Sequence, residues 1–451
     1  MRLSRLSIAL GAAAASWLAA ACLQLPPAIA EASNVSQQAT IADKDISDAY
    51  IYLLGRLLVL RQQQLDFQEG MQWNTLVHRK PGAVEWPNPN LDVAYSEAWV
   101  AVDEKSCTMV SVPQISGRYY TVQFLNGWGE TLANINERAY PQHPSGDFAV
   151  CLKGASVTLP ANAQRIDLPV RSARVLSRVE LGADWNEAER LQQQFTMRPT
   201  GSPQPPEIPR TPAFTLQKLP GVEVFDAAEA AMREPDLNPG MDALQSRVRA
   251  IVAVIGEPKE RARIDQVIRT RAFADFARSA KTLGPGKLRN GWLRPAVSGA
   301  YGSDYLTRTL VDYGGIWANT QQEVNYYRGG MDSKGELLDS GQTYSLTFTR
   351  DELPASQAHY FWSITATDAR TFLALPNPLN RFTINNQSQL QYGKDGSLTL
   401  YFGPNKPKDA PEANWLPTVP GKIFRLMFRY YGAKGGVASG EYFPPPLVKQ
   451  S

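Results

Sequence analysis

Short apolar segments separated by turn residues constrain the fold of this chain more than any other feature of its sequence. From residue 93 to residue 181, segments of about four to ten residues rich in Val, Tyr, Phe and Trp are separated by Pro, Gly or Asn. Short strands that follow one another without helices are typical of a β-sandwich or jelly roll, not of a parallel α/β sheet. The strands predicted for this first lobe cover residues 93–102, 107–112, 119–124, 148–153, 165–168 and 174–180.

A second region of the same character closes the chain. Its clearest strands cover residues 344–349, 360–368, 381–385, 398–402 and 423–430. Glycines at positions 335, 341, 393 and 396 mark turns between them. The chain is therefore predicted to be mainly β, with two lobes that are each a β-sandwich or jelly roll.

Outside these two regions the sequence predicts helices and one extended connection. Apolar residues recur at helical spacing, and Pro and Gly mark the ends of the helical segments. The predicted helices cover residues 43–67, 184–194, 227–233, 241–255 and 259–282. Six prolines between residues 199 and 212 exclude a helix or a central strand there. This segment is predicted to be an extended linker or a strap across a surface.

The first 30 residues have the pattern of a secretory signal peptide. Arg2 and Arg5 precede an uncharged segment of about 16 apolar or small residues, and residues 26–30 read Pro-Pro-Ala-Ile-Ala. A membrane-spanning helix needs roughly 20 apolar residues, so an uncleaved anchor is disfavoured. We expect cleavage near Ala30 and a periplasmic or secreted protein. A lipoprotein modified at Cys22 is the alternative, although Leu18 stands four residues before it where three are usual.

These predictions divide the chain into six parts. They are a signal peptide at residues 1–30, a flexible lead-in with the N-terminal helix at 31–68, a first β lobe at 69–197, a Pro-rich linker at 198–221, a helical subdomain at 222–290 and a second β lobe at 291–451.

The charge of the chain argues against nucleic acid as a partner. The net charge is +3, and it is +1 without residues 1–30, which contain two basic and no acidic residues. Phosphate binding needs a concentrated basic surface, and the sequence contains no block rich in Lys or Arg. No later segment is long and apolar enough to span a membrane.

Two cysteines remain once the first 30 residues are removed. Cys107 and Cys151 both lie in predicted strands of the first lobe. In an oxidising compartment two such cysteines can form a disulfide. The alternative is two buried thiols that do not pair.

Two stretches of sequence suggest that the lobes repeat one module. Residues 92–95 (Asp-Val-Ala-Tyr) compare with residues 323–326 (Glu-Val-Asn-Tyr). Farther along, Pro113 and the aromatic strand from residue 118 compare with Pro354 and the aromatic strand from residue 359. Because the order of these features is the same in both stretches, we expect an internal duplication of one sandwich.

A set of short motifs connects the chain to known proteins. In the first lobe they are residues 89–96, Trp99, residues 117–120 and Gln123. In the second they are Tyr305, Arg308, Asp332, Gly335, Leu338, Gly341, residues 361–365, 395–398 and 414–417, Arg429 and Tyr431. Together they resemble the paired bacterial families called domain of unknown function 1254 (N-terminal) and 1214 (C-terminal). The resemblance implies two β-sandwich or jelly-roll lobes with a helical insertion, and it implies no established activity.

The chain departs from the usual pattern of these families at three positions. Val93, Asn126 and Thr367 stand where the families usually have Thr, Asp and Tyr. A family active site that used the Thr or the Asp would be altered in this protein.

One group of residues in the first lobe is a candidate for carboxylate chemistry. Asp92 stands where a loop enters a strand, and Arg118 can reach it if the two strands pair. With Tyr119 they could act in a hydrolase- or lyase-type enzyme. The alternative is a structural pair that ties two strands together. The sequence contains no nucleophile elbow and no metal-binding spacing, and it predicts no cofactor and no metal.

Loop aromatics suggest a binding site instead. Trp86 and Trp128 stand in predicted loops beside Pro or Gly, and with Asn90 and Tyr95 they could bind a small molecule or carbohydrate. We therefore predict an exported cell-envelope protein that binds a ligand or is structural, with the enzyme as the alternative. The sequence predicts no oligomeric state.

Overall fold

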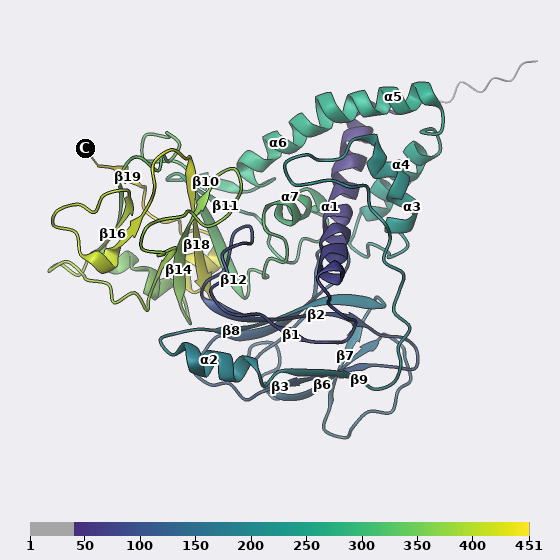
Figure 1. The fold of residues 1–451 in the computed structure, drawn as a ribbon, viewed down its shortest axis with the longest axis horizontal. Helices are drawn as coiled ribbons and strands as arrows, with labels where there is room; N and C mark the ends of the chain where they lie inside the picture. Colours follow the sequence, from purple (N-terminus) through teal and green to yellow (C-terminus); the bar gives the residue numbers. More distant parts are fainter. Residues whose placement is uncertain (1–39, 451) are drawn as a thin grey trace, which may run out of the picture. The chain divides into compact units, whose positions relative to one another are not determined.

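The first β lobe consists of two sheets in the computed structural model, which describes residues 40–450. Its strands are β1 (Val77–His78), β2 (Val93–Ala101), β3 (Thr108–Val112), β4 (Tyr120–Leu125), β5 (Thr131–Ile135), β6 (Gly146–Leu152), β7 (Gln164–Leu168), β8 (Ser172–Glu180) and β9 (Thr196–Pro199). They form a five-stranded antiparallel sheet, β1-β2-β8-β4-β5, and a four-stranded sheet, β7-β6-β3-β9. Figure 1 shows the two sheets as layers, with β2 and β8 above β3 and β6. Apolar side chains such as Phe124, Phe148 and Val175 fill the core between them.

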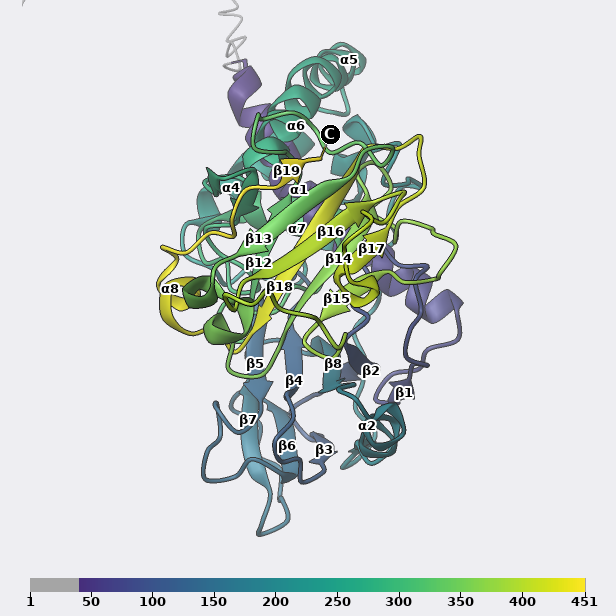
Figure 2. The same ribbon diagram turned by 90° about the vertical axis from the view of Figure 1, so that its left-hand side faces the viewer.

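The second β lobe is built in the same way. Its strands are β10 (Lys287–Arg289), β11 (Trp292–Arg294), β12 (Val324–Gly329), β13 (Tyr344–Phe348), β14 (Trp362–Asp368), β15 (Thr383–Asn385), β16 (Leu398–Gly403), β17 (Trp415–Pro417), β18 (Phe424–Tyr431) and β19 (Val448–Lys449). A six-stranded sheet, β10-β11-β12-β18-β14-β15, packs against a four-stranded sheet, β17-β16-β13-β19 (Figure 2). The predicted mainly β fold with two sandwich lobes is confirmed.

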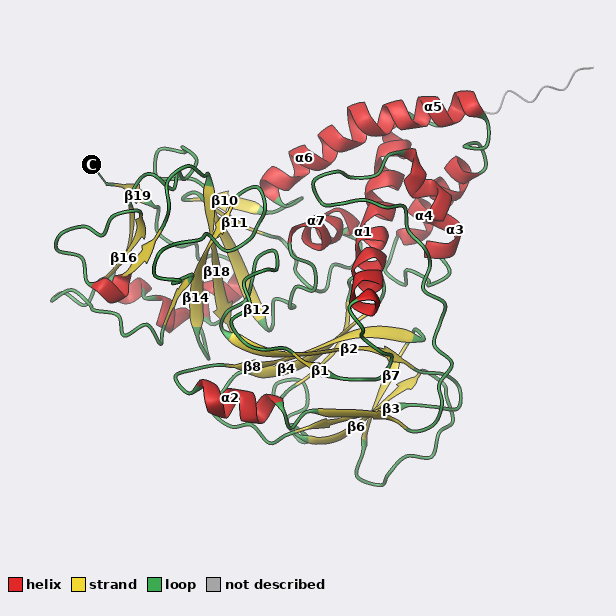
Figure 3. Cartoon of the chain, viewed as in Figure 1, coloured by secondary structure: helices red, strands yellow, loops and turns green. Residues whose placement is uncertain are grey.

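Helices from distant parts of the chain share a third core. They are α1 (Asp43–Gln68), α3 (Ala228–Ala231), α4 (Met241–Val252), α5 (Pro258–Val267), α6 (Phe273–Thr282) and α7 (Tyr305–Gly314), and a π-helical turn (Ile268–Ala272) joins α5 to α6. Two further short helices are α2 (Trp185–Gln192) and α8 (Gly435–Ser439). Because α1 is apolar on nearly every side, it is buried among the others (Figure 3). The N-terminal helix therefore belongs to the helical core.

The proline-rich segment is tied to α1. Residues 200–214 adopt no helix or strand. The Nε2 of Gln64 on α1 donates to the carbonyl of Pro209 at 2.6 Å, and Thr211 donates its hydroxyl to Gln64 at 2.9 Å. Arg61, one helical turn earlier, donates to the carbonyl of Phe214. The segment is thus held along the C-terminal half of α1, as a strap.

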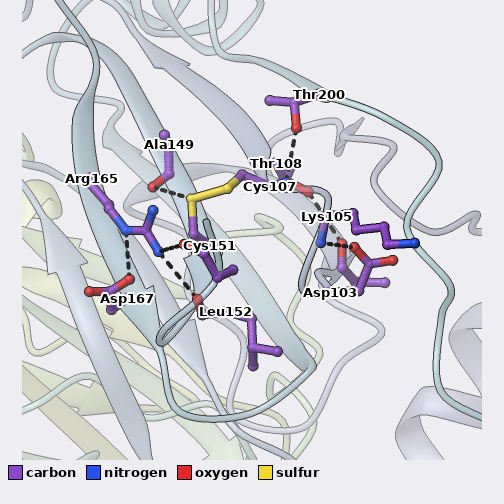
Figure 4. The surroundings of a disulfide bond; sticks show 12 residues. Asp103, Lys105, Cys107, Thr108, Ala149, Cys151, Leu152, Arg165, Asp167 and Thr200 are labelled. Atoms are coloured by element: carbon purple, nitrogen blue, oxygen red, sulfur yellow. Dashed lines mark hydrogen bonds and ion pairs between the residues drawn. A yellow bond between two sulfur atoms is a disulfide. The ribbon is translucent and has the colours of Figure 1, made fainter. Parts of the chain in front are cut away.

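A disulfide joins Cys107 and Cys151 in the first lobe (Figure 4). Cys107 immediately precedes β3 and Cys151 lies on its neighbour β6, so the antiparallel pairing of these strands brings the two sulfur atoms together. Thr200, at the start of the strap, accepts a hydrogen bond from the backbone amide of Cys107. Strand β9 therefore ends, and the strap begins, next to the disulfide.

The central strands of the two lobes repeat one pattern. The orders β2-β8-β4-β5 and β12-β18-β14-β15 are equivalent. In the first, Arg178 of β8 pairs with Tyr95 and Thr121; in the second, Arg429 of β18 pairs with Tyr326 and Ser363. The register therefore equates Tyr95 with Tyr326, as the sequence comparison did.

The same register corrects the other half of the comparison by one residue. Thr121 corresponds to Ser363, whereas the comparison of the two sequence stretches aligned Thr121 with Trp362. The aromatic residues explain the error: Tyr120 and Trp362 both face the core of their own lobe. A shift of one residue moves every side chain of a strand to the other face, so the register decides the correspondence.

No helix among residues 40–450 is long and apolar enough to cross a membrane. The expected signal peptide, the alternative lipid attachment at Cys22 and residues 31–39 of the expected lead-in lie outside the described residues.

Candidate functional site

A cavity of about 1130 Å³ lies where the two lobes and the helical core meet. Its wall comes from β2 and β8 of the first lobe, β12 and β18 of the second, and helices α1, α6 and α7. Typical small-molecule sites have volumes of roughly 300–1,000 Å³, so this cavity can accept a large ligand. It is the leading candidate for a functional site.

Alternation along the strands explains why the wall contains charged side chains. On β8, Ala173 and Val175 face the core of the first lobe, so Arg174 and Arg178 face the cavity. On β18, Leu426 and Phe428 face the core of the second lobe. The cavity face of β18 therefore consists of Arg425, Met427 and Arg429.

Two of the cavity arginines are neutralised by carboxylates. Arg174 lies 3.2 Å from the Oδ2 of Asp66 and 2.6 Å from the Oε2 of Glu97. Arg79 shares Glu97 at 3.3 Å. Arg174 and Asp66 are buried, and their contact ties β8 to α1.

Other cavity arginines have no such partner. Among residues 40–450, five further arginines of the wall form hydrogen bonds to backbone carbonyls or neutral side chains, and they form no ion pair with Asp or Glu. They are Arg61, Arg178, Arg328, Arg425 and Arg429. The wall therefore carries an excess of positive charge.

One acidic residue in the wall does not offset this charge. Burial raises the pKa of Asp312 on α7 well above its usual value, and nearby Arg308 only partly counters the effect. Its Oδ2 has no hydrogen-bond partner among the described residues. Asp312 is therefore harder to ionise than an exposed aspartate, and its carboxyl group can donate a hydrogen bond into the cavity when it is protonated.

The state of Asp312 has a consequence for stability. Because its folded pKa is raised, this residue makes the folded protein less stable as pH rises from the unfolded pKa through the folded one. Asp312→Asn removes that loss. We expect the free energy of unfolding of the variant to match that of the wild type near pH 4 and to exceed it at pH 8, where the wild type must ionise a buried carboxyl group. Urea unfolding at both pH values measures the difference, and an advantage that does not change with pH would contradict the assignment.

The central arginine of each lobe, Arg178 or Arg429, contacts the other lobe. Arg178 of the first lobe donates to the carbonyl of Trp317, at 2.9 Å, in the segment that leads to β12 of the second lobe. Arg429 of the second lobe donates to the carbonyls of Asn88 and Pro89, at 3.0 and 3.1 Å, in the segment that leads to β2 of the first. These hydrogen bonds therefore join the two halves of the cavity wall.

The acidic residues that precede β2 and β12 also contact the opposite lobe. Asp92, just before β2, accepts a hydrogen bond from Asn385 of the second lobe at 3.0 Å. Glu323, just before β12, accepts one from Asn136 of the first lobe at 2.9 Å. We call these two contacts the reciprocal carboxylate locks. They lie at the junction of the lobes, and neither Asp92 nor Glu323 lines the cavity.

The residues predicted for catalysis are not brought together. Arg118 donates to the backbone carbonyls of Glu180 and Leu181, and no hydrogen bond or ion pair joins it to Asp92 in the described part of the chain. Tyr119 is buried and donates its hydroxyl to Glu323 at 3.1 Å. Burial, and secondarily Glu323, raise the pKa of Tyr119. None of the three lines the cavity, and each has a structural contact instead.

The residues predicted for ligand binding divide into two groups. Trp86, Asn90 and Tyr95 line the cavity, and Trp86 is 43% exposed at its edge. Trp128 needs correction, because it is only 1% exposed and stacks on Tyr52 in the helical core. It cannot serve as a surface platform, since its loop is covered by α1.

The sequence analysis did not identify the cavity arginines as a group, although Arg429 was among the family motifs. A signal was present: arginines stand four residues apart in predicted strands of both lobes, at 174 and 178 and at 425 and 429. This spacing places both side chains of a pair on one face of the strand. No group of three or more His, Cys, Asp or Glu side chains that could hold a metal ion occurs among residues 40–450.

Two family models match the chain, one in each lobe. The family described as "Protein of unknown function (DUF1254)" matches residues 73–199, and "Protein of unknown function (DUF1214)" matches residues 323–435. Together the matches span more than half of the chain. Residues 73–199 thus belong to the first family and residues 323–435 to the second. The DUF1254 region holds Arg174 and Arg178, and the DUF1214 region holds Arg328, Arg425 and Arg429, so the cavity takes charged residues from each.

A solved structure supports the fold of this DUF1254 and DUF1214 protein. The crystal structure of the VPA0106 protein from Vibrio parahaemolyticus is similar, with a TM-score of 0.61, 20% sequence identity, and coverage of 91% of this chain and all of that one. An uncharacterized protein from Burkholderia cenocepacia matches with a TM-score of 0.44 and 12% identity, over 89% of this chain and 87% of that one. No curated protein matches the chain. The first comparison thus relates the two-lobed fold to that of a protein from Vibrio parahaemolyticus.

Proposed function

We propose that this protein is exported to the cell envelope and binds a small molecule with a large apolar part in the cavity between its lobes. The observation that carries this proposal is the cavity itself, with its volume of about 1130 Å³ and its wall from both lobes. A cavity of this size, open at its edge and bounded by elements of both lobes, is where a ligand is expected to bind.

The wall favours an apolar ligand over a carbohydrate. Aromatic side chains line it on several sides, among them Trp86, Tyr313, Trp317 and Phe372, with leucines from α1, α7 and β8 beside them. The guanidinium groups in the deeper wall are largely engaged by protein carbonyls, as for Arg178 and Arg429. Aromatic and aliphatic side chains therefore give the wall its preference for an apolar ligand.

The enzyme alternative receives no support at its predicted centre. Asp92 and Tyr119 belong to the junction of the lobes, and Arg118 is held by backbone carbonyls. A catalytic acid or base must reach its substrate, and these side chains do not line the cavity.

Binding of the neutral dye N-phenyl-1-naphthylamine tests the proposal. We expect saturable binding to the wild type, followed by the fluorescence of the directly excited dye. Ala280→Trp on α6 should weaken binding about tenfold or more, because Ala280 lines the cavity and a tryptophan would fill part of it. Ala274→Trp is the matched control, since Ala274 is exposed on the same helix outside the cavity. No saturable binding, or equal binding by both variants, would overturn the proposal.

Export is tested separately. The proposal of an envelope protein rests on the pattern of residues 2–30, and the disulfide between Cys107 and Cys151 fits an oxidising compartment. N-terminal sequencing of the protein from fractionated bacterial cells should give Glu31 as the first residue of a periplasmic or secreted species. An intact N-terminus in the cytoplasmic fraction would refute export.

A further inference from the structure

Two cavity arginines lie close together without a carboxylate between them. Arg328 of β12 pairs with Met427 of β18, and Arg425 is two residues away on the same face of β18. Burial, and secondarily the charge of Arg425, lower the pKa of Arg328 to about 10. Both side chains remain charged at neutral pH, so the fold holds two like charges next to each other. We call Arg328 and Arg425 the cation pair.

Protein groups only partly compensate the cation pair. Arg328 donates to the carbonyls of Ala280 and Lys281, at 2.9 and 3.4 Å, near the C-terminal end of α6. Arg425 donates to the carbonyl of Ala369 and lies 4.7 Å from the ring centroid of Phe372.

The nearest acid is already engaged elsewhere. Asp368 acts on Arg425 from a distance, but its carboxylate binds Lys422 at 2.7 Å. Guanidinium groups that lack a carboxylate are well suited to bind an oxyanion, because each presents several N–H donors in one plane.

The surface beside the cation pair is apolar. Leu288, Leu337 and Ile423 line the cavity, yet they are 50%, 61% and 44% exposed. Large aliphatic side chains that are exposed at the edge of a cavity mark a place where an apolar ligand enters or lies. The cation pair and this apolar edge together match a molecule with one charged and one apolar part.

We propose that the cation pair binds the oxyanion headgroup of an amphipathic acid, such as a long-chain carboxylate, whose apolar part occupies the cavity. This inference rests on the proposed function, because it names the ligand class of the same cavity. Each buried CH₂ of a hydrocarbon chain strengthens binding, so the chain supplies affinity and the headgroup supplies selectivity.

A pair of dyes that differ in charge tests this inference. 1-Anilinonaphthalene-8-sulfonate and N-phenyl-1-naphthylamine share one ring system, and only the first carries a sulfonate. We expect Arg328→Gln and Arg425→Gln each to weaken binding of the sulfonate about tenfold, while the neutral dye binds as before. Arg289→Gln is the control, because Arg289 is exposed on β10 of the same sheet and does not line the cavity.

A second measurement needs no variant. Raising the salt from 50 to 500 mM should weaken binding of the sulfonate several-fold and leave the neutral dye unchanged, because salt screens charge–charge attraction. Hexadecanoate and hexadecyl phosphate should displace the neutral dye at much lower concentrations than hexadecan-1-ol, which has the same chain without the charge.

The outcomes separate the two proposals. If the neutral dye does not bind the wild type, the proposed function fails. If it binds, but the sulfonate binds equally to the wild type and both Gln variants, or the alcohol displaces it as well as the acids, the cation pair does not recognise an anion and only this inference is overturned.

Discussion

Replacing Glu323 with alanine is expected to destabilise the protein by about 3–5 kcal/mol. Its carboxylate is only 5% exposed, and it accepts hydrogen bonds from Tyr119 and Asn136 and pairs with Arg138. Tyr119 and Asn136 are fully buried. Alanine would therefore leave the Tyr119 hydroxyl without a partner, and Asn136 would keep only its hydrogen bond to Thr121. Each unsatisfied buried group costs about 1–3 kcal/mol. Chemical unfolding measures the loss.

The position of Glu323 adds a second expected effect. Tyr119, Asn136 and Arg138 belong to the first lobe and Glu323 to the second, so the variant weakens the junction of the lobes. We expect the single unfolding transition to broaden or to separate into two.

A control shows whether this effect depends on the junction. Glu187→Ala removes an exposed pair with Arg190 on α2 and should have no measurable effect. If Glu323→Ala behaves like Glu187→Ala, the reciprocal carboxylate locks do not hold the lobes together.

Arg308→Met is expected to cost a similar 3–5 kcal/mol, because it breaks a buried ion pair in the helical core. Arg308 on α7 contacts both carboxylate oxygens of Asp236, at 3.2 and 2.5 Å, and their side chains are 1% and 0% exposed. The methionine can fill much of the space but leaves the charge of Asp236 buried and unpaired. Urea unfolding of the variant checks this loss.

A double variant separates the lost charge from the lost packing. Arg308→Met with Asp236→Leu removes both charges, and we expect it to recover most of the stability lost in Arg308→Met. Arg261→Met is the control in the helical region, since the pair of Arg261 with Asp226 is largely exposed and should contribute less than about 1 kcal/mol. A double variant as unstable as the single one would show that packing of the arginine stem, rather than its charge, is what matters.

Local patterns predicted much of the fold because they are strong in this chain. The helix expected over residues 43–67 is α1 (Asp43–Gln68), since a long apolar pattern suits a helix buried on most sides. Most strands of the first lobe begin and end within about two residues of their predicted bounds, because β-branched and aromatic residues dominate them.

Other elements lack such a pattern. Strand β5 (Thr131–Ile135) is a partly exposed edge strand with few large apolar residues, and it was not predicted. Helix α7 (Tyr305–Gly314) was missed although Asp304 caps its N-terminus through the backbone amide of Thr307. Both elements are stabilised by contacts with a neighbouring element: β5 pairs with β4, and α7 packs against α1.

The candidate site was harder to predict than the fold. Trp86, Asn90 and Tyr95 do line the cavity, because the segment before β2 crosses its wall. The cation pair combines strands β12 and β18, which are about a hundred residues apart, and no local pattern states that they are neighbours. Asp92 and Arg118 were expected to meet if their strands paired, yet β2 and β4 both pair with β8, and Asp92 binds Asn385 of the other lobe. Contacts between lobes depend on their docking, which the sequence pattern does not describe.

The central claim is that the cavity between the lobes holds an amphipathic ligand. A crystal structure of the protein with 1-anilinonaphthalene-8-sulfonate tests it most directly. The account predicts the naphthalene ring within the cavity between β8 and β18, with a sulfonate oxygen about 3 Å from a guanidinium nitrogen of Arg328 or Arg425. Dye bound only at an exposed surface, with the cavity empty, would contradict it.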